Sequence, residues 1–210
     1  MTAEIRNQHG QKMGRKGKET RQKIMDVTLK MLENRSYKDI TVSEVAQEAG
    51  VSSSSFYVYF EDIEDVLFAC VKAAALDLGD LHEILDEDWD HENLTAQVQR
   101  FVDTYNQLWA KYQVELRIRN LEADQGNVRF LNVRVETTRD ILQKLGKKIA
   151  RLNPSLEHPY QISIGVHAAM GAIAAQHEIG ITRGASKQTR KLLSAGIVEM
   201  ICEIMKGGPS

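Results

Sequence analysis

The sequence predicts an all-α protein of about nine helices. Apolar residues recur at intervals of three and four along most of the 210 residues, which is the spacing of one helix face. Residues Thr41 to Glu44 have the pattern of a capping box, and no segment shows the alternation of a half-buried strand between turns. The 42% apolar and 27% charged content is that of a globular protein and excludes a mainly disordered chain.

The N-terminal third contains three predicted helices. The first covers about residues 19–34, where the apolar side chains share one face. The second begins after the capping box and ends at Gly50, because glycine adopts the left-handed conformation of a helix stop. The third covers about residues 52–59, with Ser52 as its N-cap.

Longer helices follow in the rest of the chain. One is predicted across residues 62–81, and the acidic run 86–90 interrupts the pattern after it. The next helix is predicted at about residues 94–112, and a short helix that ends near Leu121 follows it. Three further helices are predicted at 130–152, 159–181 and 187–205.

The charge is unevenly distributed although the formal net charge is only −2. Residues 1–23 carry seven Lys or Arg against two acids and include three glycines, so we expect residues 1–18 to form a flexible basic arm. Such arms commonly bind nucleic acid, and a solvated terminus without a partner is the alternative. The acidic residues 61–92 should face away from any phosphate backbone.

Several protein classes are excluded. Two cysteines cannot staple a chain of 210 residues, so Cys70 and Cys202 are expected to be buried thiols. The most apolar window, 163–181, contains two histidines and a glutamate, so no membrane span is expected. The N-terminus lacks the apolar region of a secretory signal, which makes the cytoplasm the expected location.

Residues 41–59 have the pattern of a helix-turn-helix. Ala46 is small where one helix must cross the other closely, and Gly50 allows a tight turn. Val51 and Phe56 can anchor the second helix to a core. The outward positions then carry hydroxyl groups that can bind phosphates or base edges, at Ser52, Ser53, Ser54, Ser55, Tyr57 and Tyr59. An αα-hairpin with a polar face is the alternative.

The stretch from Thr20 to Leu67 resembles the N-terminal domain of TetR-family (tetracycline-repressor-like) transcriptional regulators. The resemblance rests on Thr20-Arg21-Gln22-Lys23-Ile24, Ile40 to Ala46, Ala49 to Ser52, Phe56-Tyr57, Tyr59-Phe60 and Glu64 to Leu67. It implies a helix-turn-helix DNA-binding domain at residues 19–65 and a helical ligand-binding and dimerisation domain at 66–206. It also implies that Thr41 contacts a phosphate, that Ser43 lies near the groove, that Ser53 to Ser55 face bases or backbone, and that Tyr57 and Tyr59 face phosphates.

Three residues depart from the family pattern. Ser36 replaces a usual glycine, Ser54 stands where glycine or proline is common, and Ile63 replaces a lysine that binds phosphate. We expect the basic arm to compensate for that missing lysine by following the DNA backbone or entering the minor groove. The candidate cations are Arg15, Lys16 and Lys18.

The resemblance also implies roles for the C-terminal helices. The last two helices would form a homodimer interface, since residues 164–181 are rich in small side chains, although a buried helix pair in a monomer is the alternative. The middle helices would enclose an extended hydrophobic or amphipathic effector. Candidate lining residues, each of which could instead be ordinary core or surface, are Phe101, Tyr105, Trp109, Tyr112, Asn120, Glu122, Arg134, Thr138, His167 and Met170.

An enzyme is the competing hypothesis. Residues 82–92 concentrate acids and histidines, but only His82 and Asp86 have the spacing of two ligands on one helical face. No nucleophile elbow, phosphate loop or dinucleotide-binding glycine motif occurs. We expect no catalytic site, metal or cofactor, and a helical interaction adaptor would not explain residues 41–59.

Together these observations predict a homodimeric repressor that binds a palindromic double-stranded DNA operator and releases it when a small effector binds. The helix predicted at 62–81 would transmit the change between the two domains.

Overall fold

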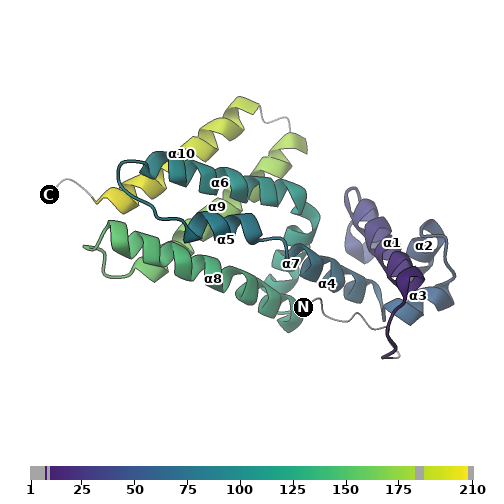
Figure 1. Cartoon of the computed structure of the whole chain (residues 1–210). Helices are drawn as coiled ribbons and strands as arrows, with labels where there is room; N and C mark the ends of the chain where they lie inside the picture. The colour runs from purple at the N-terminus through teal and green to yellow at the C-terminus, as the bar shows by residue number, and fades with distance from the viewer. Residues whose placement is uncertain (1–7, 9, 183–186, 208–210) are drawn as a thin grey trace. The chain divides into compact units, whose positions relative to one another are not determined.

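The computed structural model describes residue 8, residues 10–182 and residues 187–207 (Figure 1). The described residues form α-helices, one short 3-10 helix and no strand, which confirms the all-α fold class. The elements are α1 (Arg15–Leu32), η1 (Tyr37–Asp39), α2 (Val42–Glu48), α3 (Ser53–Tyr59), α4 (Ile63–Ala74), α5 (Gly79–Asp86), α6 (Leu94–Lys111), α7 (Gln113–Asp124), α8 (Val128–Leu152), α9 (Pro159–Thr182) and α10 (Lys187–Lys206).

The chain divides into two compact units. The first contains α1 to α4 together with residues Val114–Leu131, and the second contains Ala75–Gln113 and the chain from Asn132 onward. This division differs from the boundary predicted between residues 65 and 66. The physical reason is packing: Val66 and Cys70 of α4 belong to the same buried cluster as Ile24 of α1.

The first unit is built around the three-helix core that the sequence predicts. Its buried apolar cluster comprises Ile24, Met25, Ile40, Val45, Ala46, Ala49, Phe56, Phe60, Val66 and Cys70. The capping box of α2 is present, since the amide of Glu44 donates to the hydroxyl of Thr41 (3.3 Å) and the amide of Thr41 donates to the Glu44 carboxylate (2.9 Å). Residues 114–131 join this unit partly through the edge-to-face contact of Phe68 with Phe130.

The N-terminal prediction needs a correction. The first helix begins at Arg15, so residues 15–18 are helical and do not belong to a flexible arm. Met13 is buried, and the amide of Gln8 donates a hydrogen bond to the carbonyl oxygen of Val58 (3.0 Å). The glycines that suggested flexibility were misleading because Gly14 serves as the N-cap of α1.

The single helix predicted across residues 62–81 is a second correction, because the structure has two helices there. α4 ends at Ala74 and α5 begins at Gly79. The carboxylate of Asp77 in the link accepts hydrogen bonds from Lys111 (2.6 Å) and Tyr112 (2.6 Å) at the end of α6. These bonds, from Lys111 first, lower the pKa of Asp77 and tie the link to the end of α6.

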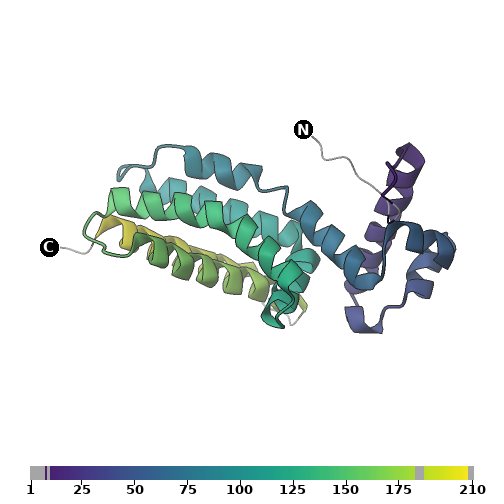
Figure 2. The same ribbon diagram turned by 90° about the horizontal axis from the view of Figure 1, so that it is seen from below.

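The second unit is a bundle of long helices. Figure 2 shows α8, α9 and α10 as long helices of this unit, and α10 packs against α6 and α9. α8 and α9 approach closely where a Cβ atom on Gly146 would lie 3.2 Å from the Cα of Tyr160. Trp89 is buried against Phe101, and its indole nitrogen donates to the carbonyl oxygen of Ile84 (2.9 Å). No helix within the described residues is long and apolar enough to cross a membrane.

Candidate nucleic-acid interface

The turn between α2 and α3 fixes the orientation of the second helix. Gly50 has φ +66°, a left-handed conformation that strains residues with a side chain. The amide of Val51 then donates to the carbonyl oxygen of Ala46 (2.9 Å). Phe56 is fully buried and anchors α3 to the core, so one face of α3 is directed inward and the opposite face outward.

The outward face of α3 presents hydroxyl groups. Ser53 and Ser54 are exposed, and Tyr57 retains 52% of its surface accessible. Ser52 is also exposed, but its hydroxyl caps α3 by accepting from the amide of Ser55 (3.1 Å). The side chain of Ser55 is half-buried and accepts from Ser52 (3.0 Å). Ser53 and Tyr57, one helical turn apart, are therefore the best placed of the predicted contacts.

Tyr59 lies differently from the expectation of a phosphate-facing side chain. It is half-buried, and a Cβ atom on Gly17 of α1 would lie 3.8 Å from its ring. Because successive residues of a short helix point in different directions, the spacing of Tyr57 and Tyr59 places only Tyr57 well outside.

The start of α2 is polar and tightly bonded. The Thr41 hydroxyl donates to the Glu44 carboxylate (2.8 Å), and Arg35 forms an ion pair with the same carboxylate (3.0 Å). These hydrogen bonds, from Arg35 first and then Thr41, lower the pKa of Glu44 to about 2. Ser43, the other residue implied to lie near the groove, is exposed.

The cations predicted to contact DNA lie on α1. Arg15, Lys16 and Lys18 are all exposed in its first turns, as a DNA contact would require. Arg15 lies 3.5 Å from Glu19 across one turn of the same helix, both of them largely solvent-exposed. Lys23, further along, has its ammonium 3.4 Å from the position of a Cβ on Gly50.

The N-terminal segment reaches the junction of α3 and α4. The side-chain amide of Gln8 donates to the carboxylate of Asp65 (2.8 Å), in addition to the backbone bond with Val58. Asp62 caps α4 by accepting from the amide of Asp65 (2.8 Å). Gln8 is thus bonded to Asp65 in the first turn of α4, the helix that begins at Ile63, where the family lysine is missing.

A polar network in the first unit was not predicted from the sequence. Tyr37 donates to the buried carboxylate of Glu122, and Asn127 donates both to Glu122 (3.2 Å) and to Glu64 (3.0 Å). The hydrogen bond with Glu122 is the first cause that raises the pKa of Tyr37 to about 12. Tyr37 and Glu122 are 85 residues apart, so no local pattern could identify the pair.

Arg129 extends this network. It pairs with Asp65 (2.9 Å), lies 3.9 Å from Glu64 and stacks over the ring of Phe68 at 4.2 Å from its centroid. Asp65 therefore accepts from both Arg129 and Gln8.

The ten predicted effector residues are divided between the units. Asn120 and Glu122 lie in the first unit, and the other eight in the second. Phe101, Tyr105, Trp109 and Met170 are buried, whereas Tyr112, Arg134, Thr138 and His167 are half-buried. His167 meets the ring of Tyr105 edge-on at 5.6 Å, and Thr138 donates to the carbonyl oxygen of Arg134 (2.8 Å). The two described cavities are lined by other residues.

The acidic segment 82–92 is engaged in ion pairs with basic residues of α6 and α8. Asp86 pairs with Lys144 (2.8 Å), Glu87 with Arg100 (2.5 Å) and Asp88 with Arg151 (2.8 Å). His82 Nδ1 lies 3.2 Å from the Asp140 carboxylate, without hydrogen-bond geometry. Within the described part of the chain no three acids, histidines or cysteines are grouped as metal ligands.

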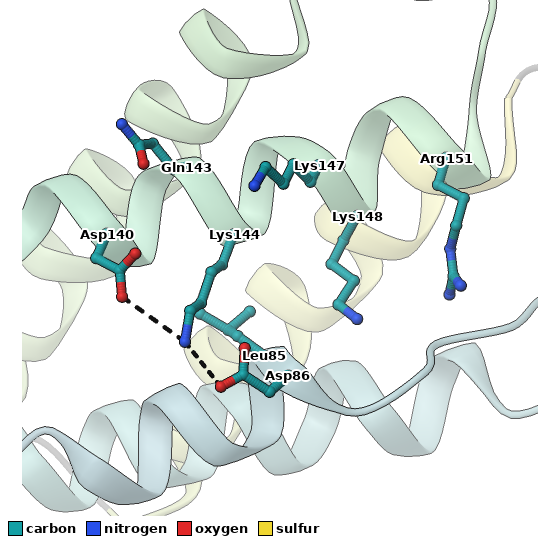
Figure 3. A pocket seen from close by; sticks show the side chains of 8 residues that line it. All are labelled: Leu85, Asp86, Asp140, Gln143, Lys144, Lys147, Lys148 and Arg151. Carbon is teal, nitrogen blue, oxygen red and sulfur yellow. Dashed lines mark hydrogen bonds and ion pairs between the residues drawn. The ribbon is translucent and has the colours of Figure 1, made fainter.

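A cavity of about 280 Å³ lies along this basic face of α8. Figure 3 shows Lys144, Lys148 and Arg151 extending from α8 toward α5 and the segment after it. Lys148 donates to the carbonyl oxygen of Glu87, and its pKa is lowered first by burial and then by the neighbouring Arg151. The remaining lining residues are Leu85, Asp86, Asp140, Gln143 and Lys147.

Comparison with known families agrees with this geometry. Residues 24–70 match the family of bacterial regulatory proteins of the tetR type, and residues 81–197 match the tetracyclin repressor-like C-terminal domain.

Two individual relatives match this chain over alignments of different length. The chain is 29% identical over 110 residues to the fatty acid metabolism regulator protein of Bacillus subtilis, covering 49% of this chain and only 55% of that regulator. It is 24% identical over 194 residues to an HTH-type transcriptional regulator of Haemophilus influenzae, covering 90% and 89% of the two chains.

Solved structures share the fold. The fatty acid degradation regulator FadR from Bacillus halodurans superposes with a TM-score of 0.66 at 17% identity, covering 94% of this chain and 98% of that one. A TetR family transcription regulator from Marinobacter aquaeolei gives a TM-score of 0.67 at 14% identity, covering 91% and 98%. Since the two family matches together span most of the sequence, the chain belongs to the TetR family of DNA-binding transcriptional regulators.

Proposed function

We propose that this regulator binds a palindromic operator as a homodimer, represses transcription there and releases the DNA when a small molecule binds its C-terminal domain. The observation that carries the proposal is the outward face of α3, where Ser53 and Tyr57 are exposed on a helix anchored by buried Phe56. Thr41, Ser43, Ser52, Ser54 and Ser55 complete the proposed contact region, with the first two at the start of α2. Tyr59, which is half-buried near Gly17 of α1, is not included.

The homodimer is proposed through α9 and α10. Ile164 is 43% exposed on α9 and Leu192 is 63% exposed on α10, and exposed small residues such as Ala168 and Gly196 accompany them. A large apolar patch is costly in water and marks an interaction surface. A two-fold dimer would present two recognition helices about 34–36 Å apart, which is one turn of DNA.

Phosphate binding is assigned to the N-terminal cations. Arg15, Lys16 and Lys18 are exposed, and each neutralised phosphate adds sequence-independent affinity. The bonds from Gln8 to Val58 and Asp65 hold Gln8 at the start of α4, the helix that begins at Ile63. They support the hypothesis that the N-terminal segment binds the phosphate that a lysine at position 63 would otherwise bind.

The effector is proposed to be hydrophobic or amphipathic. The buried aromatics Phe101, Tyr105 and Trp109 line up on α6 of the second unit, and a fatty acid metabolism regulator is among the relatives. The effector would stabilise a conformation with lower operator affinity. A typical coupling of about 1–3 kcal/mol lowers that affinity roughly 5–150-fold.

The test is selection of sheared genomic DNA on the purified full chain at about 150 mM salt, followed by sequencing. We expect one enriched palindrome that is bound by a species of two chains, as measured by light scattering. Adding medium-chain and long-chain fatty acids or their thioesters should release it. Monomeric binding to an asymmetric site, or folded protein that enriches no sequence, would contradict the proposal.

A further inference from the structure

The helix-turn-helix carries no basic residue. From Asp39 to Val71 the sequence contains no Lys, Arg or His, and it contains seven acids. This stretch includes α2, the turn, α3 and most of α4. Most DNA-reading helices combine base contacts with cationic phosphate contacts, so the absence limits what this surface can recognise.

Guanine is the base most affected by this absence. The commonest specific contact in DNA complexes is an Arg or Lys side chain that binds O6 and N7 of guanine. Neither α2 nor α3 can form it. The one amide side chain between residues 41 and 59, Gln47, lines a cavity of about 390 Å³ together with Val27 and Met31 of α1.

The groups that α3 does present are short and neutral. Ser53, Ser54 and Tyr57 are exposed, whereas the hydroxyl of Ser52 is used in capping the helix. A serine Cβ and the edge of a tyrosine ring can contact the C5-methyl group of thymine, which only A·T pairs carry, whereas a hydroxyl can bond to either purine. A helix face without long side chains also allows its backbone to approach the groove closely.

We infer that α3 reads A·T base pairs in the major groove through hydroxyl and methyl contacts and makes no charge-assisted contact with guanine. This inference rests on the proposed DNA binding and specifies the class of sequence recognised. Phosphate neutralisation then belongs to a separate surface, formed by Arg15, Lys16 and Lys18 on α1. Base selection and salt-dependent affinity are thereby carried by different elements of the same unit.

The experiment replaces single atoms in the DNA. The full chain is first used to select a site from a random duplex library at about 150 mM salt. Affinity is then measured for duplexes in which each thymine is replaced by uracil, which lacks the methyl group, or each guanine by 7-deazaguanine, which lacks N7. We expect uracil at one or more half-site positions to lower affinity about fourfold, the effect of one buried methyl group, and 7-deazaguanine to have no effect there.

Variants assign these effects to α3. Tyr57→Ala and Ser53→Gly, which remove the carbon atoms proposed to contact the methyl group, should reduce the uracil effect. Lys18→Gln should weaken binding to all sequences equally and leave the selected site unchanged. Ser53→Arg should create a preference for guanine at one position of about fivefold or more. Ala96→Arg, which adds the same charge on an exposed position of α6, should create none.

One result would contradict the inference alone, and another would contradict the proposed function as well. A strong loss with 7-deazaguanine at a half-site position, abolished by Ser53→Ala, would show that a hydroxyl reads guanine and would overturn the inference while leaving the regulator intact. Failure of the folded chain to select any sequence would instead overturn the proposed function and the inference with it.

Discussion

The helix-turn-helix and the α5–α8 region use polar side chains in opposite ways. On α3, Ser53 and Tyr57 remain exposed and no described interaction with another part of the protein uses their hydroxyls. Along α8, Lys144 and Arg151 are paired with carboxylates of α5 and the segment after it. Both regions are rich in polar residues, so composition alone does not separate a surface kept for a partner from one that is neutralised internally.

This difference implies that substitutions in the two regions have separate effects. Exposed residues of α3 should affect DNA binding without affecting folding, and the charges of α5 and α8 should affect folding without affecting DNA binding. Each prediction below tests one side of that contrast, beginning with the largest effect.

Truncating Phe56 to alanine should cost about 3–5 kcal/mol of unfolding free energy, because it removes a fully buried ring from the core that anchors α3. Denaturant titration followed by circular dichroism measures this loss. Tyr57→Phe, the adjacent exposed position, is the matched control and should leave the midpoint unchanged. Equal losses in both variants would mean that the outward face is also part of the core.

Leu192→Glu should raise the dissociation constant of the dimer about thirtyfold or more, since it introduces a charge into the proposed apolar interface of α10. Analytical ultracentrifugation over a dilution series measures it. Leu76→Glu provides the comparison, because Leu76 is 88% exposed but lies outside α9 and α10. A dimer that tolerates Leu192→Glu as well as Leu76→Glu would place the interface elsewhere.

Tyr57→Phe should weaken binding to the selected operator about fivefold, the effect of one hydrogen bond of about 1 kcal/mol. The unfolding free energy should stay the same, because the hydroxyl has no described partner within the protein. Fluorescence anisotropy with a labelled duplex measures the change. Unchanged operator affinity would remove Tyr57 from the interface.

Lys144→Met should lower the unfolding free energy by at most about 1 kcal/mol, as expected for ion pairs near the surface. The substitution leaves the carboxylates of Asp86 and Asp140 without their ammonium partner. Lys30→Met, on an exposed position of α1, controls for the loss of one charge. Reduced operator affinity in Lys144→Met, with stability unaffected, would contradict the structural role assigned to this region.

The capping box should make the unfolding free energy slightly dependent on pH. The pKa of Glu44 is about 2 in the folded protein, below its ordinary 4.5, so its contribution is present above pH 4.5 and is lost as the pH falls toward 2. Glu44→Gln cannot titrate and should lack this part of the acid-induced decrease. Denaturant midpoints measured between pH 5 and the acid limit of folding compare the two proteins. Parallel pH profiles would show that Glu44 has an ordinary pKa.

Local features of the sequence determined much of the DNA-binding unit. The capping box at Thr41 and Glu44, the left-handed Gly50 and the buried Phe56 are all found as predicted. Each depends on residues within a few positions, where backbone geometry and helical periodicity decide the outcome. The hydroxyl face of α3 follows from the same periodicity.

Tertiary structure decided what depends on distant residues. It placed Glu122 with Tyr37 in the first unit, turned Tyr59 toward α1, divided the helix after residue 62 and paired the acids at 86–88 with α6 and α8. The extent of the arm belongs here too, because burial of Met13 and the Gln8 bonds depend on a surface formed by α3 and α4. A side chain's partner is set by which helices pack together, and that is fixed by the summed burial of many residues rather than by local spacing.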